Sequence, residues 1–421
     1  MVSQELVAGL IFVVTYALIA TDRMDKTFGA LAGGILMILL GVLDQEQAFE
    51  AIDFNVIFLL AGMMIIANVL GKTGVFQWVA VKSARLGRGD PSAILAIISV
   101  VTAFASALVD NVTTVVLIVP LTFFIASRLQ ISPVPFLIAA ILSSNIGGTA
   151  TLIGDPPNIL VGSAAHLDFI AFLLNLAPVT IVVFAAFLVT CWLFFAKKLV
   201  VHDDLKAALM EIKDEDLITD KALLKKALAV LALTILGFLV HGALGLEPAT
   251  IALAGASALM VVGKHNAHHI LSEVEWATLF FFIGLFMVVG GVVRAGIIDA
   301  IAQGALDATQ GNLALTSMLI LWLSAILSAL VDNIPYTTTM IPIVKELGNS
   351  MDAAPLWWSL ALGACLGGNA TIIGASANVI VANLAARSGF PISFGSYLKY
   401  GVIITVESMV ISSVYIWIRY L

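Results

Sequence analysis

Long apolar stretches separated by short polar segments dominate the chain. Eight of them approach the length of a membrane-spanning helix, which needs about 20 apolar residues: 6–21, 27–43, 54–71, 169–196, 227–243, 249–263, 276–293 and 397–418. Two further stretches, 134–166 and 356–387, are interrupted by Gly, Pro and polar residues, which predicts broken helices. The pattern therefore predicts an all-α polytopic membrane protein with about ten transmembrane helices.

Two other segments, 92–128 and 313–347, carry a polar centre between two apolar arms. We expect each to form a re-entrant helical hairpin, because irregular backbone at membrane depth is tolerated where protein or a cavity supplies hydrogen-bond partners. Lys and Arg gather after the first and third stretches and in 197–226, which places these loops in the cytoplasm. This arrangement predicts a multi-pass protein of the cytoplasmic (inner) membrane with both termini outside.

Composition narrows the class of protein. Hydrophobic residues make up 61% of the 421 residues and charged residues 11%, whereas a soluble domain carries about 25% charged residues. A soluble enzyme and a disordered protein are excluded, and a net charge of −7 without a basic patch excludes a nucleic-acid partner. Cys191 and Cys365 lie in apolar runs without metal-ligand spacing, so we expect buried packing residues, no metal site and no cofactor.

The chain contains an internal repeat. Ala107–Asn111 recurs as Ala329–Asn333 at an offset of 222 residues, within a wider match of glycines and prolines. GGTATLIGDPPNI from Gly147 aligns with GGNATIIGASANV from Gly367 at an offset of 220. Such matches indicate that one structural unit occurs twice.

The two copies have opposite orientations when the sides are assigned by positive charge. Inverted repeats with paired Gly/Pro-interrupted helices are typical of secondary transporters, which hold substrate near the midplane where the breaks meet. We expect 1–197 to form the first inverted repeat, 198–226 a cytoplasmic linker and 227–421 the second inverted repeat.

The first motif pair places a carboxylate in the centre of each hairpin, at Asp110 and Asp332. A charge at this depth costs several kcal/mol and is kept where it faces a polar cavity, binds a cation or exchanges a proton. The alternative is a helix cap at the hairpin tip. The neighbours expected to bind substrate or ion with them are Ser106, Asn111, Thr113, Thr114, Ser328, Asn333 and Thr337.

The second motif pair lies in the two broken helices. Glycines let the backbone unwind, and the freed amides, carbonyls and half-helix ends can form an ion or oxyanion site; close helix packing is the alternative role of the glycines. The second copy has Ala375 in place of Asp155, so the first half carries an extra carboxylate. The expected binding residues are Asn145, Gly147, Gly148, Thr149, Thr151, Asp155, Asn158, Gly367, Gly368, Asn369, Thr371 and Asn378.

At these motifs, 106–114, 145–158, 332–335 and 367–378, the sequence resembles the ion transporter superfamily, within it the branch of arsenite/antimonite permeases and Na+/H+ antiporters. The resemblance implies an elevator-type transporter in which hairpins and broken helices move against the remaining spans. It also implies a homodimer and, for an arsenite permease, an accessory ATPase subunit.

Within that branch, the chain looks most like an arsenite/antimonite efflux permease coupled to proton entry. Arsenous acid is neutral and presents three hydroxyls, which suits amide, hydroxyl and carboxylate partners, and Asp110, Asp155 and Asp332 would carry the proton. The alternative is a Na+(Li+)/H+ antiporter in which the same oxygens ligate a hard cation, so the coupling ion is a proton or Na+. An anion carrier is less favoured because the carboxylates repel anions. Whether Glu407 is a second protonation site or a packing residue stays open.

Overall fold

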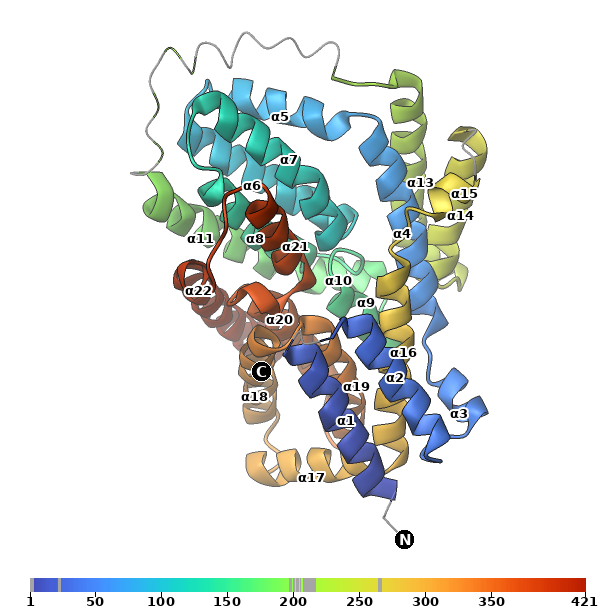
Figure 1. The fold of residues 1–421 in the computed structure, drawn as a ribbon. Helices are drawn as coiled ribbons and strands as arrows, with labels where there is room; N and C mark the ends of the chain where they lie inside the picture. Colours follow the sequence, from blue (N-terminus) through green and yellow to red (C-terminus); the bar gives the residue numbers. More distant parts are fainter. Residues whose placement is uncertain are drawn as a thin grey trace.

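The computed structural model describes residues 4–21, 24–196, 217–263 and 267–421, with positions 199, 201, 204 and 206, and these residues form helices and connecting turns (Figure 1). The helices in chain order are α1 (Gln4–Ala20), α2 (Lys26–Leu39), α3 (Gln45–Glu50), α4 (Phe54–Lys72), α5 (Val75–Leu86), α6 (Pro91–Leu108), α7 (Asn111–Leu129), α8 (Val134–Gly148), α9 (Pro156–Ala165), α10 (Phe169–Asn175), α11 (Ala177–Phe195), α13 (Lys221–Leu244), α14 (Pro248–Gly263), α15 (Ala267–Leu271), α16 (Trp276–Arg294), α17 (Ile297–Thr309), α18 (Leu313–Leu330), α19 (Asn333–Gly348), α20 (Ala353–Gly367), the 3-10 helix η2 (Ile372–Gly374), α21 (Ser376–Arg387) and α22 (Phe394–Tyr420).

Length and composition select a different set of spanning helices from the ten predicted stretches, because α6, α7 and α18, which are arms of the predicted hairpins, are among those selected. Within the described ranges, eight helices are long and apolar enough to cross a membrane, or nine if α9 and α10, which meet at 117°, count as one span. Several predicted stretches give shorter helices. The 27–43 stretch ends its helix at Leu39, because Gly41 adopts a left-handed turn with φ 73°. The 169–196 stretch forms two helices, α10 and α11, because Pro178 stands in the first turn of α11 and cannot continue a preceding helix.

Both predicted broken helices are confirmed. In the first half α8 ends at Gly148 and α9 begins at Pro156. In the second half α20 ends before a short 3-10 turn, and α21 follows. In the first break the chain folds back on itself at two glycines. A Cβ on Gly148 would lie 2.4 Å from the carbonyl oxygen of Gly154. Any larger residue at Gly148 would push the backbone at Gly148 and Gly154 apart.

Each predicted hairpin is a pair of helices joined at the motif carboxylate. Asp110 is the N-cap of α7 and Asp332 the N-cap of α19, and each accepts a hydrogen bond from a backbone amide of the first turn. The cap role considered for these carboxylates is therefore present. The arms α6 and α7 have 18 and 19 residues, as long as spanning helices.

Equivalent helices of the two halves occupy opposite places in the molecule. Near the ends of the bundle, α5 and α15 lie at the top of Figure 1, and their counterparts at the 222 offset, α17 and α3, lie at the bottom. Extensive helix–helix contacts are also duplicated. In one, α2 packs on α16, and in its equivalent α14 packs on α4. A Cβ on Gly62 would meet Ala252 at 2.7 Å, and one on the equivalent Gly284 would meet the equivalent Ala30 at 2.4 Å.

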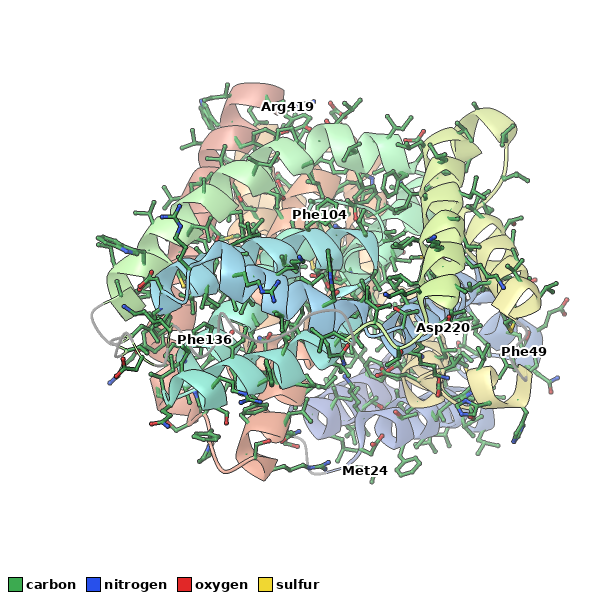
Figure 2. All side chains as sticks on the ribbon, turned by 90° about the horizontal axis from the view of Figure 1, so that it is seen from above. Met24, Phe49, Phe104, Phe136, Asp220 and Arg419 are labelled. Atoms are coloured by element: carbon green, nitrogen blue, oxygen red, sulfur yellow. The ribbon has the colours of Figure 1, made fainter. Side chains whose placement is uncertain are left out.

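The surface is apolar, as expected of a protein in a bilayer. Phe104 is 68% exposed and Phe49 52%, and Phe49 lies at the edge of the bundle (Figure 2). The exposure of so many large apolar side chains is unfavourable in water but suits contact with lipid. Most of the predicted 198–226 linker lies outside the described residues, as does Arg23 of the positive-charge argument. The end of that linker forms the start of α13.

Candidate functional site

The two hairpins and the first broken helix meet at one buried carboxylate. Asp155, the N-cap of α9, is 0% exposed. Its Oδ1 accepts from Asn111 Nδ2 at 3.1 Å and from Asn333 Nδ2 at 3.3 Å. The two asparagines are the first residues of α7 and α19. Equivalent residues of the two halves therefore converge on a single carboxylate oxygen.

An amide network carries this contact across to the second broken helix. Asn145 accepts from Asn111 at 3.2 Å and donates to Asn369 Oδ1 at 3.0 Å and Asn378 Oδ1 at 2.9 Å. All of these side chains are buried. The network thus joins α7, α8, the unwound segment after α20 and α21 into one polar centre inside an apolar bundle.

Several predicted binding residues hold the unwound backbone in place. Asn158 donates to the carbonyls of Thr149 and Thr151 at 3.0 and 2.8 Å, and Asn378 donates to those of Gly368 and Thr371 at 2.7 and 2.9 Å. These bonds satisfy carbonyls that the helix break has freed. Other predicted hydroxyls also bond to backbone: those of Ser106, Thr151, Ser328 and Thr371 donate to carbonyls of neighbouring helices, and those of Thr149 and Thr337 donate to the carbonyl four residues earlier in the chain.

Four buried polar atoms of the centre lack a partner in the described part of the chain: Asp155 Oδ2, Asn111 Oδ1, Thr114 Oγ1 and Asn369 Nδ2. Buried polar groups are nearly always paired, so each such atom calls for an explanation. Three of the four are oxygens, and one belongs to a carboxylate. Such a set can accept a proton or a hard cation.

The other two predicted carboxylates lie at the edge of this centre. Asp110 is 6% exposed and accepts from the Thr113 amide at 2.7 Å. Asp332 forms an ion pair with Lys26 at 3.1 Å and accepts from Ser376 at 2.5 Å. They are therefore placed around Asp155 but do not share its amide partners.

Sequence reasoning missed three residues of the site. Lys26 and Ser376 were not among the predicted binding residues. Cys365 was expected to be a packing residue. It is buried, but its Sγ lies 3.4 Å from Asn158 Oδ1. The repeat offset of 220 could have found Cys365, because it aligns with Asn145.

Glu407 lies away from this centre. Its carboxylate accepts from the Thr190 hydroxyl at 3.2 Å, which joins α22 to α11. Among the residues described, no group of three or more His, Cys, Asp or Glu side chains is placed to hold a metal ion.

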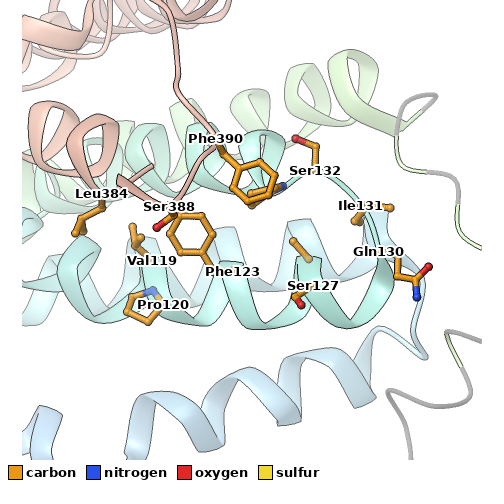
Figure 3. Close-up of a pocket in the computed structure, with 12 residues that line it drawn as sticks. Val119, Pro120, Phe123, Ser127, Gln130, Ile131, Ser132, Leu384, Ser388 and Phe390 are labelled. Atoms are coloured by element: carbon orange, nitrogen blue, oxygen red, sulfur yellow. The ribbon is translucent and has the colours of Figure 1, made fainter. Parts of the chain in front are cut away.

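Two cavities flank the site. One of about 660 Å³ lies between α16, α9 and α19 and has charged groups on its wall, including Asp53, Arg294 and Lys345. The other, of about 910 Å³, lies between α7 and α21 and is mainly apolar (Figure 3). Phe123 and Phe390 face each other across it with ring centroids 6.2 Å apart. The first cavity reaches Leu160, one turn beyond the N-terminal end of α9, and so approaches the buried carboxylate.

Comparisons with known proteins agree with a transporter. The family profile described as citrate transporter (CitMHS) matches residues 16–363. An uncharacterized transporter of Mycobacterium tuberculosis is 44% identical over 99% of both chains, and the P protein of Homo sapiens is 30% identical over 99% of this chain and 60% of its own. In three dimensions the chain is similar to the YdaH transporter of Alcanivorax borkumensis, with a TM-score of 0.61, 16% identity, and coverage of 99% of this chain and 98% of that one.

The residues that match the family profile include both hairpins and the first broken helix. The relatives with the higher identity extend the match over the second broken helix as well. The chain therefore belongs to the CitMHS family of the ion transporter superfamily and is a multi-pass membrane transporter, not an enzyme.

Proposed function

We propose that the protein is a cation-coupled secondary transporter whose coupling ion, a proton or Na+, binds at Asp155. One observation carries the proposal: Asp155 is 0% exposed, and among the described residues the amide donors of Asn111 and Asn333 reach only one of its two carboxylate oxygens, with the weakly polar Cys365 thiol as the other neighbour of the carboxylate. A buried charge needs compensation. A proton or a cation at Oδ2 supplies it, and leaves again when the site opens to water.

The oxygens around Asp155 support the same proposal. Asn111 Oδ1 and Thr114 Oγ1 are also buried and unpartnered, and both come from the first turn of α7. Carboxylate, amide and hydroxyl oxygens are the ligands that hard cations prefer. No thiolate is needed for this chemistry.

The proposed transport cycle uses the two inverted repeats, 1–197 and 227–421. We infer that α6–α9 and α18–α21 move as the elevator against α1, α2, α4, α13, α14 and α16, with both termini outside. The opposite placement of α5 and α17 and of α3 and α15 supports the inversion (Figure 1). Exchange of the two repeat conformations would convert an inward-open into an outward-open state.

For the substrate we propose arsenite or antimonite, exported against proton entry. The support is the buried amide network of Asn111, Asn145 and Asn369, in which Asn111 Oδ1 and Asn369 Nδ2 have no partner among the described residues and so supply a neutral acceptor and a neutral donor for a trihydroxy acid. Na+/H+ antiport is the second candidate. The three unpartnered oxygens favour it, because carboxylate, amide and hydroxyl oxygens are the ligand types that suit a hard cation.

The test uses everted membrane vesicles from cells that lack their own arsenite and sodium exporters. Wild-type protein should accumulate arsenite when a proton gradient is imposed, and Asp155→Asn should reduce this accumulation at least tenfold. Asp155→Asn keeps the shape and the amide contacts but cannot hold a proton or compensate a cation. Sodium-driven pH changes without arsenite accumulation would instead establish the second candidate. Unchanged transport by Asp155→Asn in either assay would exclude the carboxylate as the coupling group.

A further inference from the structure

One ion pair joins α2, which carries none of the motifs, to the second hairpin. The Nζ of Lys26, the first residue of α2, lies 3.1 Å from Oδ2 of Asp332. The same ammonium donates to the Ser376 hydroxyl at 2.5 Å and lies 5.1 Å from the centroid of the Phe281 ring, whose face attracts a cation. Groups from α19, α21 and α16 thus surround this one cation.

These contacts give both oxygens of the Asp332 carboxylate partners within the protein. Its Oδ1 accepts from the Ile334 amide at 3.2 Å, and its Oδ2 accepts from both Lys26 and Ser376. The side chain of Asp332 is only 12% exposed, and that of Lys26 34%. A carboxylate with an ammonium, a hydroxyl and an amide as partners needs no external cation.

The first hairpin has no such ion pair. Asp110 has the same place in its repeat as Asp332, but its carboxylate accepts from neutral groups of the first turn of α7, such as the Thr113 amide, and no Lys, Arg or His nitrogen of the described residues pairs with it. The equivalent carboxylates of the two halves therefore have different electrostatic surroundings.

Alignment of the repeats gives the cause. The position equivalent to Lys26 is Pro248, and the position equivalent to Ser376 is Pro156. Neither proline carries a donor in its side chain. The reverse holds for the buried carboxylate, because Asp155 in the first half corresponds to an alanine in the second. One half thus has an extra anion, and the other has an extra cation.

We propose that Lys26 is a built-in cation that permanently fills the second half-site, so that the protein binds its coupling cation in the first half alone. The inference rests on the proposed function for the location of that cation at Asp155. Without the ammonium, Asp332 and Ser376 would present a carboxylate and a hydroxyl to a hard monovalent cation, which is the chemistry of such sites. Lys26 is therefore the residue that sets the number of coupling ions.

The experiment counts cations bound to the purified full-length protein. Thermal unfolding midpoints are measured against NaCl, with choline chloride holding the ionic strength constant, and against pH without Na+. Stabilisation by a bound ion rises with its concentration according to the number of sites. Wild-type protein should show one site, and Lys26→Met, which keeps the apolar stem, should show two.

Matched variants assign the second site. Lys26→Met/Asp332→Asn should return to one site, and Lys26→Met/Asp155→Asn should keep one, at Asp332. Lys26→Arg, which preserves the charge, should behave as wild type. Lys26→Gln provides a second neutral variant, which retains a donor to Asp332 if Lys26→Met folds poorly. A wild-type count in the neutral Lys26 variants would overturn the inference.

Failure of the proposed function gives a different result. In Asp155→Asn with native Lys26, the thermal unfolding midpoint should no longer depend on Na+ or pH through the ion site. If dependence remains and disappears in Asp155→Asn/Asp332→Asn, the cation binds beside Lys26 and the inference is wrong. If dependence remains in that double variant too, the assignment of the coupling ion to Asp155 is wrong, and the Lys26 variants still decide whether Asp332 gains a site.

Discussion

The two halves of the molecule repeat their packing and differ in their chemistry. At the first break, a Cβ on Gly147 would lie 2.2 Å from the carbonyl oxygen of Ala103. At the second, a Cβ on Gly367 would lie 2.5 Å from the Cα of Ala325. These are equivalent residues in equivalent contacts. The geometry of a broken helix packed against a hairpin thus leaves no room for a side chain in either copy.

The polar residues of the same two regions have diverged. Asp155 corresponds to Ala375, and Asn145 corresponds to Cys365. The close glycine contacts occur in both halves because each half has to form the same helix break. A single ion, in contrast, needs only one set of ligands. In this protein, therefore, the glycines determine the backbone geometry of the breaks, and different residues determine the ion chemistry. Variants can test each separately.

The largest effect should come from filling the duplicated contact. Gly147→Leu places a branched side chain against the backbone of Ala103, which cannot move without separating α6 from α8. Overpacking of this kind costs 1–3 kcal/mol or more, and we expect about 3 kcal/mol or complete loss of folded protein. Gly367→Leu should have an effect of the same size. Thermal unfolding in detergent and the yield of monodisperse protein measure both.

The control for these variants is Gly304→Ala. Gly304 lies inside α17, and a Cβ there would meet nothing within 4 Å. Alanine in a helix interior is about 0.5–1 kcal/mol more favourable than glycine. The unfolding midpoint should therefore rise or stay constant. A similar loss of stability at this glycine and at Gly147 would show that replacing a helical glycine lowers the stability wherever it lies, and that the close contact with Ala103 is not the cause.

A smaller and unequal effect should follow from truncating the diverged pair. Asn145→Ala removes both donors to Asn369 Oδ1 and Asn378 Oδ1, which then remain buried without them. An unpaired buried group costs about 1–3 kcal/mol, so we expect about 2–4 kcal/mol. Cys365→Ala removes weak thiol contacts, among them the one to Asn158 Oδ1, and should cost about 1 kcal/mol. Thermal unfolding measures both; equal losses would contradict the divergence that we infer from the structure.

Local signals in the sequence predicted the breaks and the hairpin joints. The glycines before Thr149 and the prolines after Asp155 act on their own backbone, so the end of α8 and the start of α9 follow from neighbouring residues. The caps at Asp110 and Asp332 are local in the same sense. The repeat then extended each prediction to the second copy.

Contacts between distant residues could not be predicted in this way. Lys26 and Asp332 are 306 residues apart, and nothing in the sequence around either one indicates the other. The convergence of Asn111 and Asn333 on Asp155 is likewise a property of how the halves are packed together. Some apolar stretches were predicted to form longer helices than they do for a related reason: apolar composition does not reveal where a turn such as that at Gly41 ends a helix.

The smallest effect concerns a contact that only one half possesses. The hydroxyl of Tyr16 on α1 donates to the Pro335 carbonyl at 2.8 Å and lies 2.6 Å from Thr339 Oγ1 on α19. The equivalent of Tyr16 is Phe238, which has no hydroxyl and stacks on Phe169 at 5.8 Å. Because Thr339 also donates to the Pro335 carbonyl, at 3.0 Å, Tyr16→Phe leaves no carbonyl unpaired.

We therefore expect Tyr16→Phe to lower the free energy of unfolding by about 1 kcal/mol, the net contribution of one ordinary hydrogen bond. A double-mutant cycle with Thr339→Val isolates the contact, because removal of the Tyr16 hydroxyl should matter less once its partner is gone. Unfolding midpoints of the two single variants and the double variant give the coupling. If Tyr16→Phe costs as much as Asn145→Ala, α1 holds the second hairpin as firmly as the amide network joins the halves. The two halves would then differ in their packing as well as in their ion chemistry. That result would contradict the conclusion from the glycine contacts that the packing is the same in both halves.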